Sequence, residues 1–185
     1  MINNLSEINL DYAKKIGAIL ILRNTQKYKP QDLLRFKSKC DSRKLDLFIA
    51  NDVKTLFLLK SNKFYISSYN KSQYWDLSKK NKKLTIVGSA HSVSEINEKL
   101  RQGCKQIFLS RLFKTKYKNK KGYLGTTKFN LLSRSFATQF VALGGINEGN
   151  FNQTKRLNSV GLALSSDKKK AGKYIPAFFK KVFKP

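Results

Sequence analysis

Short apolar runs alternate with amphipathic segments along most of the chain. The runs carry few polar residues, as expected for strands that are buried on both faces of a sheet. The pattern of run and amphipathic segment recurs about every 20–25 residues, which predicts repeated βαβ units and a parallel sheet. Seven such runs end near Leu22, Ala50, Ser67, Val87, Ser110, Leu143 and Leu164.

One of the amphipathic segments begins with a clear helix signal. The sequence Ser-Val-Ser-Glu at 92–95 has the spacing of a capping box, with Ser92 as the N-cap and Glu95 reaching back to it. Val93, Ile96 and Leu100 then repeat at helical spacing, so we expect them on one buried face.

The fold class that this pattern predicts is α/β, in the form of a (β/α)8 TIM barrel. Seven predicted strands are one fewer than the barrel requires, so the first strand is lacking or truncated. Residues 1–3 look like the tail of that strand, and we expect the barrel to be open at this edge or completed by residues encoded upstream. We expect residues 1–185 to form a single domain. A doubly wound open sheet is the alternative, although no Gly-x-Gly-x-x-Gly motif follows the first strand.

A pair of glycines interrupts the sixth apolar run. Phe140 to Leu143 stop at Gly144-Gly145, and a polar segment that can form a helix follows. Glycine lets the backbone approach a ligand closely, and a helix N-terminus favours an anion. The last run ends in Ser165-Ser166, and the final two loops of parallel barrels often share a phosphate site. This pattern predicts a phosphate site, with an ordinary turn as the alternative.

The net charge of +27 is large, but its composition weakens the case for a nucleic-acid-binding protein. The excess is overwhelmingly Lys rather than Arg, and Lys is less suited to bidentate phosphate recognition. Asn, Ile, Phe and Tyr are also abundant, so a drift toward adenine- and thymine-rich codons explains the same balance. We expect nucleic acid to bind only non-specifically through positive charge.

Several other classes of protein are disfavoured. No apolar run is long enough to cross a bilayer, and the first residues do not resemble a signal peptide, so we expect no membrane partner. Cys40 and Cys104 are far apart, and His91 is the only histidine, which excludes a structural zinc site. We expect both cysteines to be reduced and the protein to be cytoplasmic.

Four motifs, in this order and at this spacing, carry a resemblance to a known family. They are GSAHS at 88–92, FKT at 113–115, ALGGI at 142–146 and GLA at 161–163. With them the chain resembles the thiamine phosphate synthase/TenI superfamily, which consists of phosphate-binding TIM barrels of thiamine biosynthesis. The resemblance runs from about residue 10 to residue 183 and is strongest from Leu84 onward. It implies an enzyme that joins an aminopyrimidine diphosphate to a thiazole phosphate and releases pyrophosphate.

The resemblance implies roles for particular residues. The backbone of Gly144, Gly145, Ser165 and Ser166 would hold the thiazole phosphate. Asp52 would help to bind Mg²⁺, and His91 would lie next to the pyrimidine pocket. The implied catalytic residues are Arg23, His91 and Lys118, and the implied pyrophosphate ligands are Arg23, Asn51, Thr115 and Lys118.

The chain departs from the family at the diphosphate end. In the family's Gln-x-Arg-x-Lys pattern, Ile21 replaces the glutamine and Thr25 replaces the lysine. Tyr117 replaces the second threonine of Thr-x-Thr-Lys, and Asn70 and Lys71 stand near the position of a second magnesium-binding aspartate. The half of the site for thiazole phosphate is therefore kept, while the half for diphosphate and magnesium is eroded.

Structural alternatives compete with each implied role. Asp52 is equally suited to be the N-cap of a helix that begins at Val53. Arg23 is also suited to a surface ion pair, and His91 to a hydrogen bond with the backbone at a helix start. The basic segment 114–121 is also suited to a solvated loop.

Three functions compete with the synthase reaction. One is a TenI-like thiazole tautomerase, in which His91 would act as an acid or base. Another is a non-catalytic phosphate-binding barrel. RNA binding ranks last, because most aromatic residues lie at apolar-stripe positions rather than on an exposed basic face.

Overall fold

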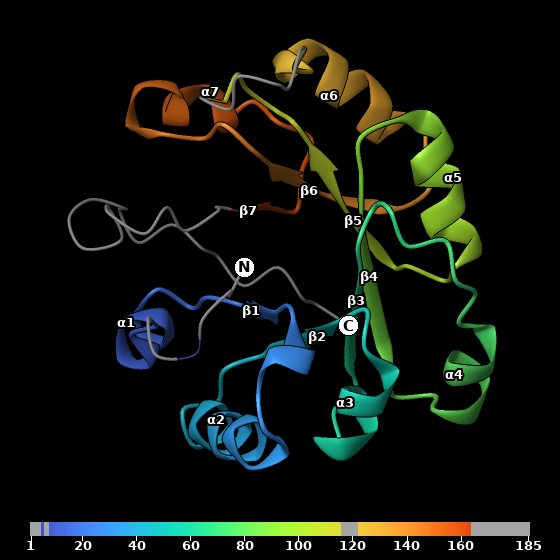
Figure 1. Ribbon diagram of the computed structural model, residues 1–185. Coiled ribbons are helices and arrows are strands. Elements are labelled where there is room, and N and C mark those ends of the chain that lie inside the picture. Colours follow the sequence, from blue (N-terminus) through green and yellow to red (C-terminus); the bar gives the residue numbers. More distant parts are fainter. Residues whose placement is uncertain (1–4, 6–7, 116–121, 164–185) are drawn as a thin grey trace.

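A single parallel sheet organises the protein. The computed structural model describes residues 5, 8–115 and 122–163 (Figure 1). Within them the strands lie in the order β1 to β7, and every neighbouring pair is parallel. The strands are β1 (Leu20–Leu22), β2 (Leu47–Ala50), β3 (Lys63–Ile66), β4 (Thr85–Ala90), β5 (Gln106–Ser110), β6 (Gln139–Leu143) and β7 (Gly161–Ala163).

Helical segments connect the strands and lie on the outer side of the curled sheet (Figure 1). None of the helices in the described ranges is long and apolar enough to cross a membrane. The helical segments are α1 (Leu10–Lys15), η2 (Thr25–Lys27), α2 (Pro30–Ser42), α3 (Val53–Leu58), α4 (Trp75–Lys80), α5 (Val93–Arg101), α6 (Gly125–Arg134), η3 (Glu148–Asn150) and α7 (Phe151–Thr154).

The two faces of the sheet belong to two separate apolar clusters. The outer cluster joins strand residues such as Leu22 and Ile49 to helix residues such as Phe36 and Ile96. The inner cluster consists of residues from the strands and their immediate flanks, among them Phe48. Alternate residues of one strand therefore point into different clusters, and both faces are buried, which explains the absence of polar alternation.

This arrangement confirms the α/β class and the seven parallel strands that the pattern predicts. A doubly wound sheet would carry helices on both faces, whereas among the described residues the inner cluster consists of strand residues and their immediate flanks. The structure is a curled half-barrel whose described edges are β1 and β7. Closure with an eighth strand stays a prediction, because residues 1–4 and 164–185 lie outside the described part.

Some local predictions were wrong. β4 extends to Ala90, so the Gly-Ser-Ala segment continues the strand rather than following it. The polar segment after Ile146 forms only the short η3 and the four-residue α7. On α5, Val93 is 47% exposed, while Lys99 is fully buried.

The two cysteines are free, in agreement with the expectation that they are reduced, and both are buried. Burial raises the pKa of Cys40 to about 11 and that of Cys104 to about 12. Since the thiolate is the reactive form, both thiols are poor nucleophiles at neutral pH.

Candidate functional site

The carboxyl ends of the strands form one polar edge of the sheet. Because all the described strands are parallel, the residues that follow them lie at the same edge, where α/β proteins bind their ligands. The predicted site residues that the structure brings to this edge are Arg23 after β1, Asn51 and Asp52 after β2, His91 after β4, Thr115 in the loop after β5, and Gly144 and Gly145 after β6. Lys118, Ser165 and Ser166 lie outside the described residues.

Asn51 is the centre of a hydrogen-bonded cluster that joins the ends of β2 and β3. Its φ of 58° lies in the left-handed region, which asparagine tolerates better than most residues. Its Nδ2 donates to Ser67 Oγ at 2.7 Å and to the Tyr69 hydroxyl at 3.1 Å. Its Oδ1 accepts from the Ser67 N–H at 2.8 Å. Asn51 therefore fixes the β3–α4 loop against β2 and holds Tyr69, which is 70% exposed, at the surface.

Arg23 places a positive charge beside this cluster. The pKa of the Tyr69 phenol lies below its ordinary value. The hydrogen bond with the Ser67 hydroxyl has the largest effect and lowers the pKa, whereas burial raises it. A hydrogen bond with Arg23 and the charge of Arg23 lower the pKa further. The same charge acts on Tyr65 on the inner face, although burial dominates there and raises the pKa of that phenol. A guanidinium surrounded by polar groups at a strand end is suited to a phosphate.

Asp52 is the N-cap of α3. Its Oδ1 accepts from the Thr55 N–H at 3.0 Å, and its Oδ2 accepts from the hydroxyls of Thr55 at 2.7 Å and Thr25 at 2.5 Å. Burial has the largest single effect on the pKa of Asp52 and raises it. The hydrogen bonds from Thr25 and Thr55 together outweigh that effect and leave the pKa below its ordinary value.

A magnesium ion held by protein carboxylates does not fit this edge. Both oxygens of Asp52 already accept hydrogen bonds that cap α3 and tie down the β1–α2 connection. Asn70 stands near the position where the family has a second magnesium-binding aspartate. Its side-chain amide is hydrogen-bonded to Asn51, the Ser72 N–H and Tyr74. No group of three His, Cys, Asp or Glu side chains suited to a metal occurs in the described part of the chain.

His91 forms a pair with Glu95 at the start of α5. The Glu95 Oε2 accepts from the His91 N–H at 2.7 Å and lies 3.0 Å from His91 Nδ1. This corrects the predicted capping box. The Ser92 hydroxyl does cap α5 by accepting from the Glu95 N–H, but the Glu95 side chain accepts from the His91 N–H rather than from that of Ser92. Because a carboxylate only accepts, this contact requires a proton on Nδ1, which in the neutral form of the ring puts the lone pair on Nε2. The side chains of His91 and Glu95 are 47% and 37% exposed, respectively.

The glycine turn after β6 packs against the loop after β5. Both glycines have positive φ, 98° at Gly144 and 72° at Gly145. The Gly144 carbonyl accepts from the Phe113 N–H at 3.0 Å, so the Gly145 N–H of the same trans peptide points away from that loop. A Cβ on Gly145 would lie 2.4 Å from the Phe113 carbonyl oxygen. Only glycine fits this turn.

Side-chain amides hold the far side of the turn. Asn147 Nδ2 and Asn150 Nδ2 donate to the Gly145 carbonyl at 3.2 and 2.8 Å. Asn147 also caps η3 by accepting from the Gly149 N–H at 3.0 Å. The short helix expected to receive a phosphate is thus already capped, and the backbone N–H groups of the turn itself are the better candidates.

The β5–α6 loop contributes a second cation to the edge. Arg111 Nη1 donates to Thr115 Oγ1 at 3.2 Å, and the Arg111 side chain lies 3.1 Å from the position of a Gly144 Cβ. Arg111 and Tyr69 were not predicted from the sequence as parts of the site. Their positions, immediately after β5 and shortly after β3, are the signal that points to them.

The class of protein that this fold defines is an α/β half-barrel, with a polar edge at the carboxyl ends of its parallel strands. The family model for thiamine monophosphate synthase matches residues 10–167. The chain belongs to this family, and the resemblance to the thiamine phosphate synthase/TenI superfamily is confirmed.

Individual relatives agree with this assignment. The chain is 36% identical over 80 residues to the thiamine-phosphate synthase of Prochlorococcus marinus, an alignment that covers 43% of this chain and 23% of the relative. Thiamine phosphate pyrophosphorylase from Pyrococcus furiosus has a similar fold, with a TM-score of 0.64 at 13% identity over 85% of this chain and 79% of that one. FabK from Thermotoga maritima matches with a TM-score of 0.62 at 15% identity, over 82% of this chain and 51% of its own. The structural matches indicate the fold alone.

Proposed function

We propose that this protein joins an aminopyrimidine diphosphate to a thiazole phosphate and releases pyrophosphate. The observation that supports this most is the cluster of Arg23, Asn51, Ser67 and Tyr69 at the ends of β1 to β3, which offers a cation and polar donors to a diphosphate. The glycine turn after β6 offers backbone N–H groups to the thiazole phosphate.

The proposed reaction needs charge stabilisation more than proton transfer. The bond between the pyrimidine methylene carbon and the diphosphate oxygen breaks, and pyrophosphate leaves with the electron pair. The thiazole nitrogen then donates its lone pair to the methylene cation and forms the new C–N bond. Arg23 would offset the charge that develops on the leaving group, with Thr115 and Lys118 as further ligands. His91 would border the pyrimidine ring.

A second candidate function is a TenI-like conversion between thiazole tautomers. The observation that favours it is the pairing of His91 with Glu95, which leaves Nε2 available to accept a proton. This reaction needs no diphosphate ligands and no metal, so it agrees with the eroded half of the site.

One pair of assays separates the two functions. Synthase activity predicts thiamine phosphate from the two substrates, and Arg23→Gln should lower the rate about 100-fold by removing the cation at the leaving group. Tautomerase activity predicts interconversion of the thiazoles, and Glu95→Gln should lower that rate about tenfold or more by releasing the histidine. Arg101→Gln, on the exposed face of α5, is the control for Glu95→Gln. Purified protein that forms no thiamine phosphate, with or without added Mg²⁺, would reject the synthase proposal.

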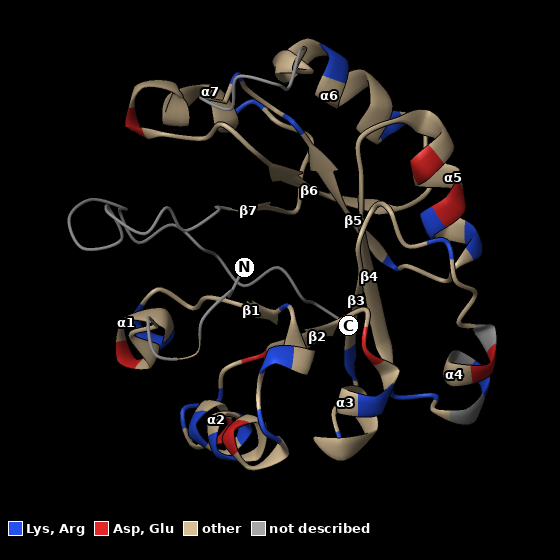
Figure 2. Ribbon diagram, viewed as in Figure 1, with Lys and Arg blue, Asp and Glu red and all other residues tan. Residues whose placement is uncertain are grey.

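The positive charge predicts only weak association with RNA. Within the part of the chain that the structure describes, Lys and Arg are spread over several helices, among them α2, α3, α5 and α6 (Figure 2). We expect an RNA oligomer of any sequence to bind weakly and to be released at moderate salt, because diffuse Lys contacts act through counterion release. A filter-binding titration at increasing salt checks this. Tight, sequence-dependent binding that persists at high salt would support the RNA-binding alternative instead.

A further inference from the structure

Lys99 is a fully buried lysine in the middle of α5. Its side chain passes over Gly88 of β4, where a Cβ would lie 2.8 Å from Lys99 Cδ and 2.8 Å from Cys104 Sγ. The absence of a side chain at Gly88 therefore creates the space that the lysine stem fills. An apolar residue such as methionine, which has nearly the same length, would also fill this space. A buried ammonium, by contrast, is costly unless it is hydrogen-bonded.

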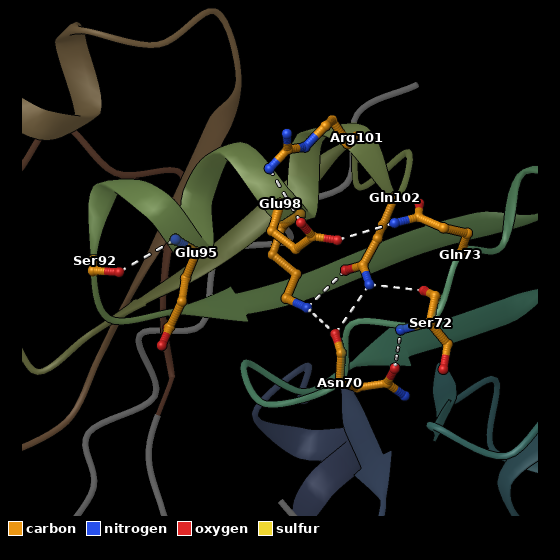
Figure 3. Close-up of polar contacts among 9 residues, drawn as sticks. Asn70, Ser72, Gln73, Ser92, Glu95, Glu98, Arg101 and Gln102 are labelled. Atoms are coloured by element: carbon orange, nitrogen blue, oxygen red, sulfur yellow. Dashed lines mark hydrogen bonds and ion pairs between the residues drawn. The ribbon is translucent and has the colours of Figure 1, made fainter.

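The ammonium of Lys99 binds neutral oxygens of the β3–α4 loop and of Gln102, the residue that follows α5. Nζ donates to the Asn70 carbonyl at 2.7 Å and to Gln102 Oε1 at 2.7 Å. Gln102 is also buried, and its Nε2 donates to the carbonyls of Asn70 at 3.0 Å and Ser72 at 2.8 Å (Figure 3). Burial lowers the pKa of Lys99, with smaller opposing effects from Cys104, Glu98 and Glu95. Lys99 of α5 and Gln102, the C-cap of that helix, thus hold the main chain of the loop at Asn70.

The same loop residue continues the connection to the candidate site. Asn70 Nδ2 donates to Asn51 Oδ1 at 3.2 Å and to the Tyr74 hydroxyl at 2.8 Å. Asn51 in turn donates to Ser67 and Tyr69. A continuous chain of hydrogen bonds therefore runs from Lys99 through Asn70 and Asn51 to the phenol beside Arg23.

We propose that Lys99 is a positioning residue, which clamps the β3–α4 loop and thereby holds Asn51 and Tyr69 in the arrangement that receives a diphosphate beside Arg23. Lys99 does not reach the ligand itself. Its role is to fix the Asn70 carbonyl, so that the Asn70 amide stays within reach of Asn51. This inference rests on the proposed function for the identity of the anion, whereas the geometry of the loop can be tested without any substrate.

The first test replaces Lys99 by methionine and follows Tyr69. NMR titration of isotopically labelled tyrosine reports the pKa of each phenol, and Tyr69→Phe assigns the signal. In folded Lys99→Met we expect the pKa of Tyr69 to rise toward its ordinary value, because the phenol loses its fixed position beside Arg23 and Ser67. The matched control is Gln73→Ala, which removes the hydrogen bond from the same loop to Glu98 on the same helix, and should leave Tyr69 unchanged.

The second test measures binding of inorganic pyrophosphate and of thiazole phosphate by calorimetry. Lys99→Met should weaken pyrophosphate binding about tenfold, the loss expected when one charge-assisted hydrogen bond no longer orders a site. Thiazole phosphate binding at the glycine turn should stay within about twofold of the parent protein, because the clamp does not reach that turn. If the parent protein binds no pyrophosphate, the diphosphate part of the proposed function fails, and the Tyr69 titration alone decides the role of Lys99.

The outcomes that overturn the proposal are distinct. A folded Lys99→Met protein with an unchanged Tyr69 pKa would show that the clamp does not position the phenol. An equal loss of both ligands would make Lys99 a residue of general stability. If Lys99→Met does not fold, Gln102→Leu removes the other donor to the Asn70 carbonyl and takes its place. Failure of both variants to fold would also assign Lys99 to general stability and reject positioning.

Discussion

Replacing Gly145 by valine should abolish binding of thiazole phosphate and lower the free energy of unfolding by about 3 kcal/mol or more. The Cβ would lie 2.4 Å from the Phe113 carbonyl oxygen and 2.8 Å from the Lys114 carbonyl oxygen, so it meets backbone that cannot move aside easily. The positive φ of 72° is a further strain for a β-branched residue. The turn and the β5–α6 loop should therefore separate. Thermal unfolding and calorimetric titration with thiazole phosphate measure the two effects.

Two milder variants distinguish a binding defect from a folding defect. Gly149→Ala changes a glycine of the next segment whose Cβ would make only an ordinary contact, 3.4 Å from Asn147 Oδ1, and should behave like the parent protein. Asn150→Ala removes the hydrogen bond to the Gly145 carbonyl without a clash, and should weaken thiazole phosphate binding while the protein stays folded. Full affinity in folded Gly145→Val would refute the proposed phosphate site.

The sequence predicts this fold well because the hydrophobic pattern is set by the sheet itself. β1 and β2 are buried on both faces, as at Phe48 and Ile49, so each of these strands appears as a continuous apolar run. The pattern is less informative on the helices, where a long side chain can be apolar along its stem and polar at its tip. Lys99 occupies a core position on α5 for this reason, and Val93 lies half exposed.

The candidate site divides into a part that the sequence predicts and a part that it does not. The strand order brings Arg23, Asn51 and His91 to one edge, and the regular alternation of strand and helix makes that edge predictable. The hydrogen-bond partners are not predictable in this way, because they depend on loop conformations. The bond between His91 and Glu95, and the left-handed φ of Asn51, have no pattern of their own in the sequence.

The residues that replace family motif residues at the diphosphate end have structural roles in this chain. Ile21 is part of the apolar inner cluster. Thr25 is buried and donates its hydroxyl hydrogen to Asp52, which it ties to the start of η2. The carboxylate therefore acts as a structural link between the connections that follow β1 and β2, and the N-cap alternative for Asp52 describes its observed contacts.

Asp52→Ala should accordingly destabilise the protein by about 2–3 kcal/mol, through loss of the N-cap of α3 and of the acceptor for two threonine hydroxyls. Asp52→Asn is the matched control, because asparagine caps helices about as well and keeps an oxygen for the Thr55 N–H, so it should lose less than about half as much. A ligand of a metal ion would respond differently, since both variants would abolish any Mg²⁺-dependent turnover and neither need change stability.

The pH dependence of unfolding gives an independent measure of the same carboxylate. The folded-state pKa of Asp52 is lowered, so its ionisation stabilises the fold at every pH above the ordinary carboxyl pKa of the unfolded chain. That contribution should disappear as the pH falls from the ordinary value through the lowered folded value. Chemical unfolding of the parent protein and Asp52→Asn across this acid range should therefore show two stability curves that converge as the pH falls. Curves that stay parallel, with a constant gap down to the lowest pH at which both proteins fold, would show that the charge of Asp52 contributes nothing, and would leave the carboxylate available for a ligand.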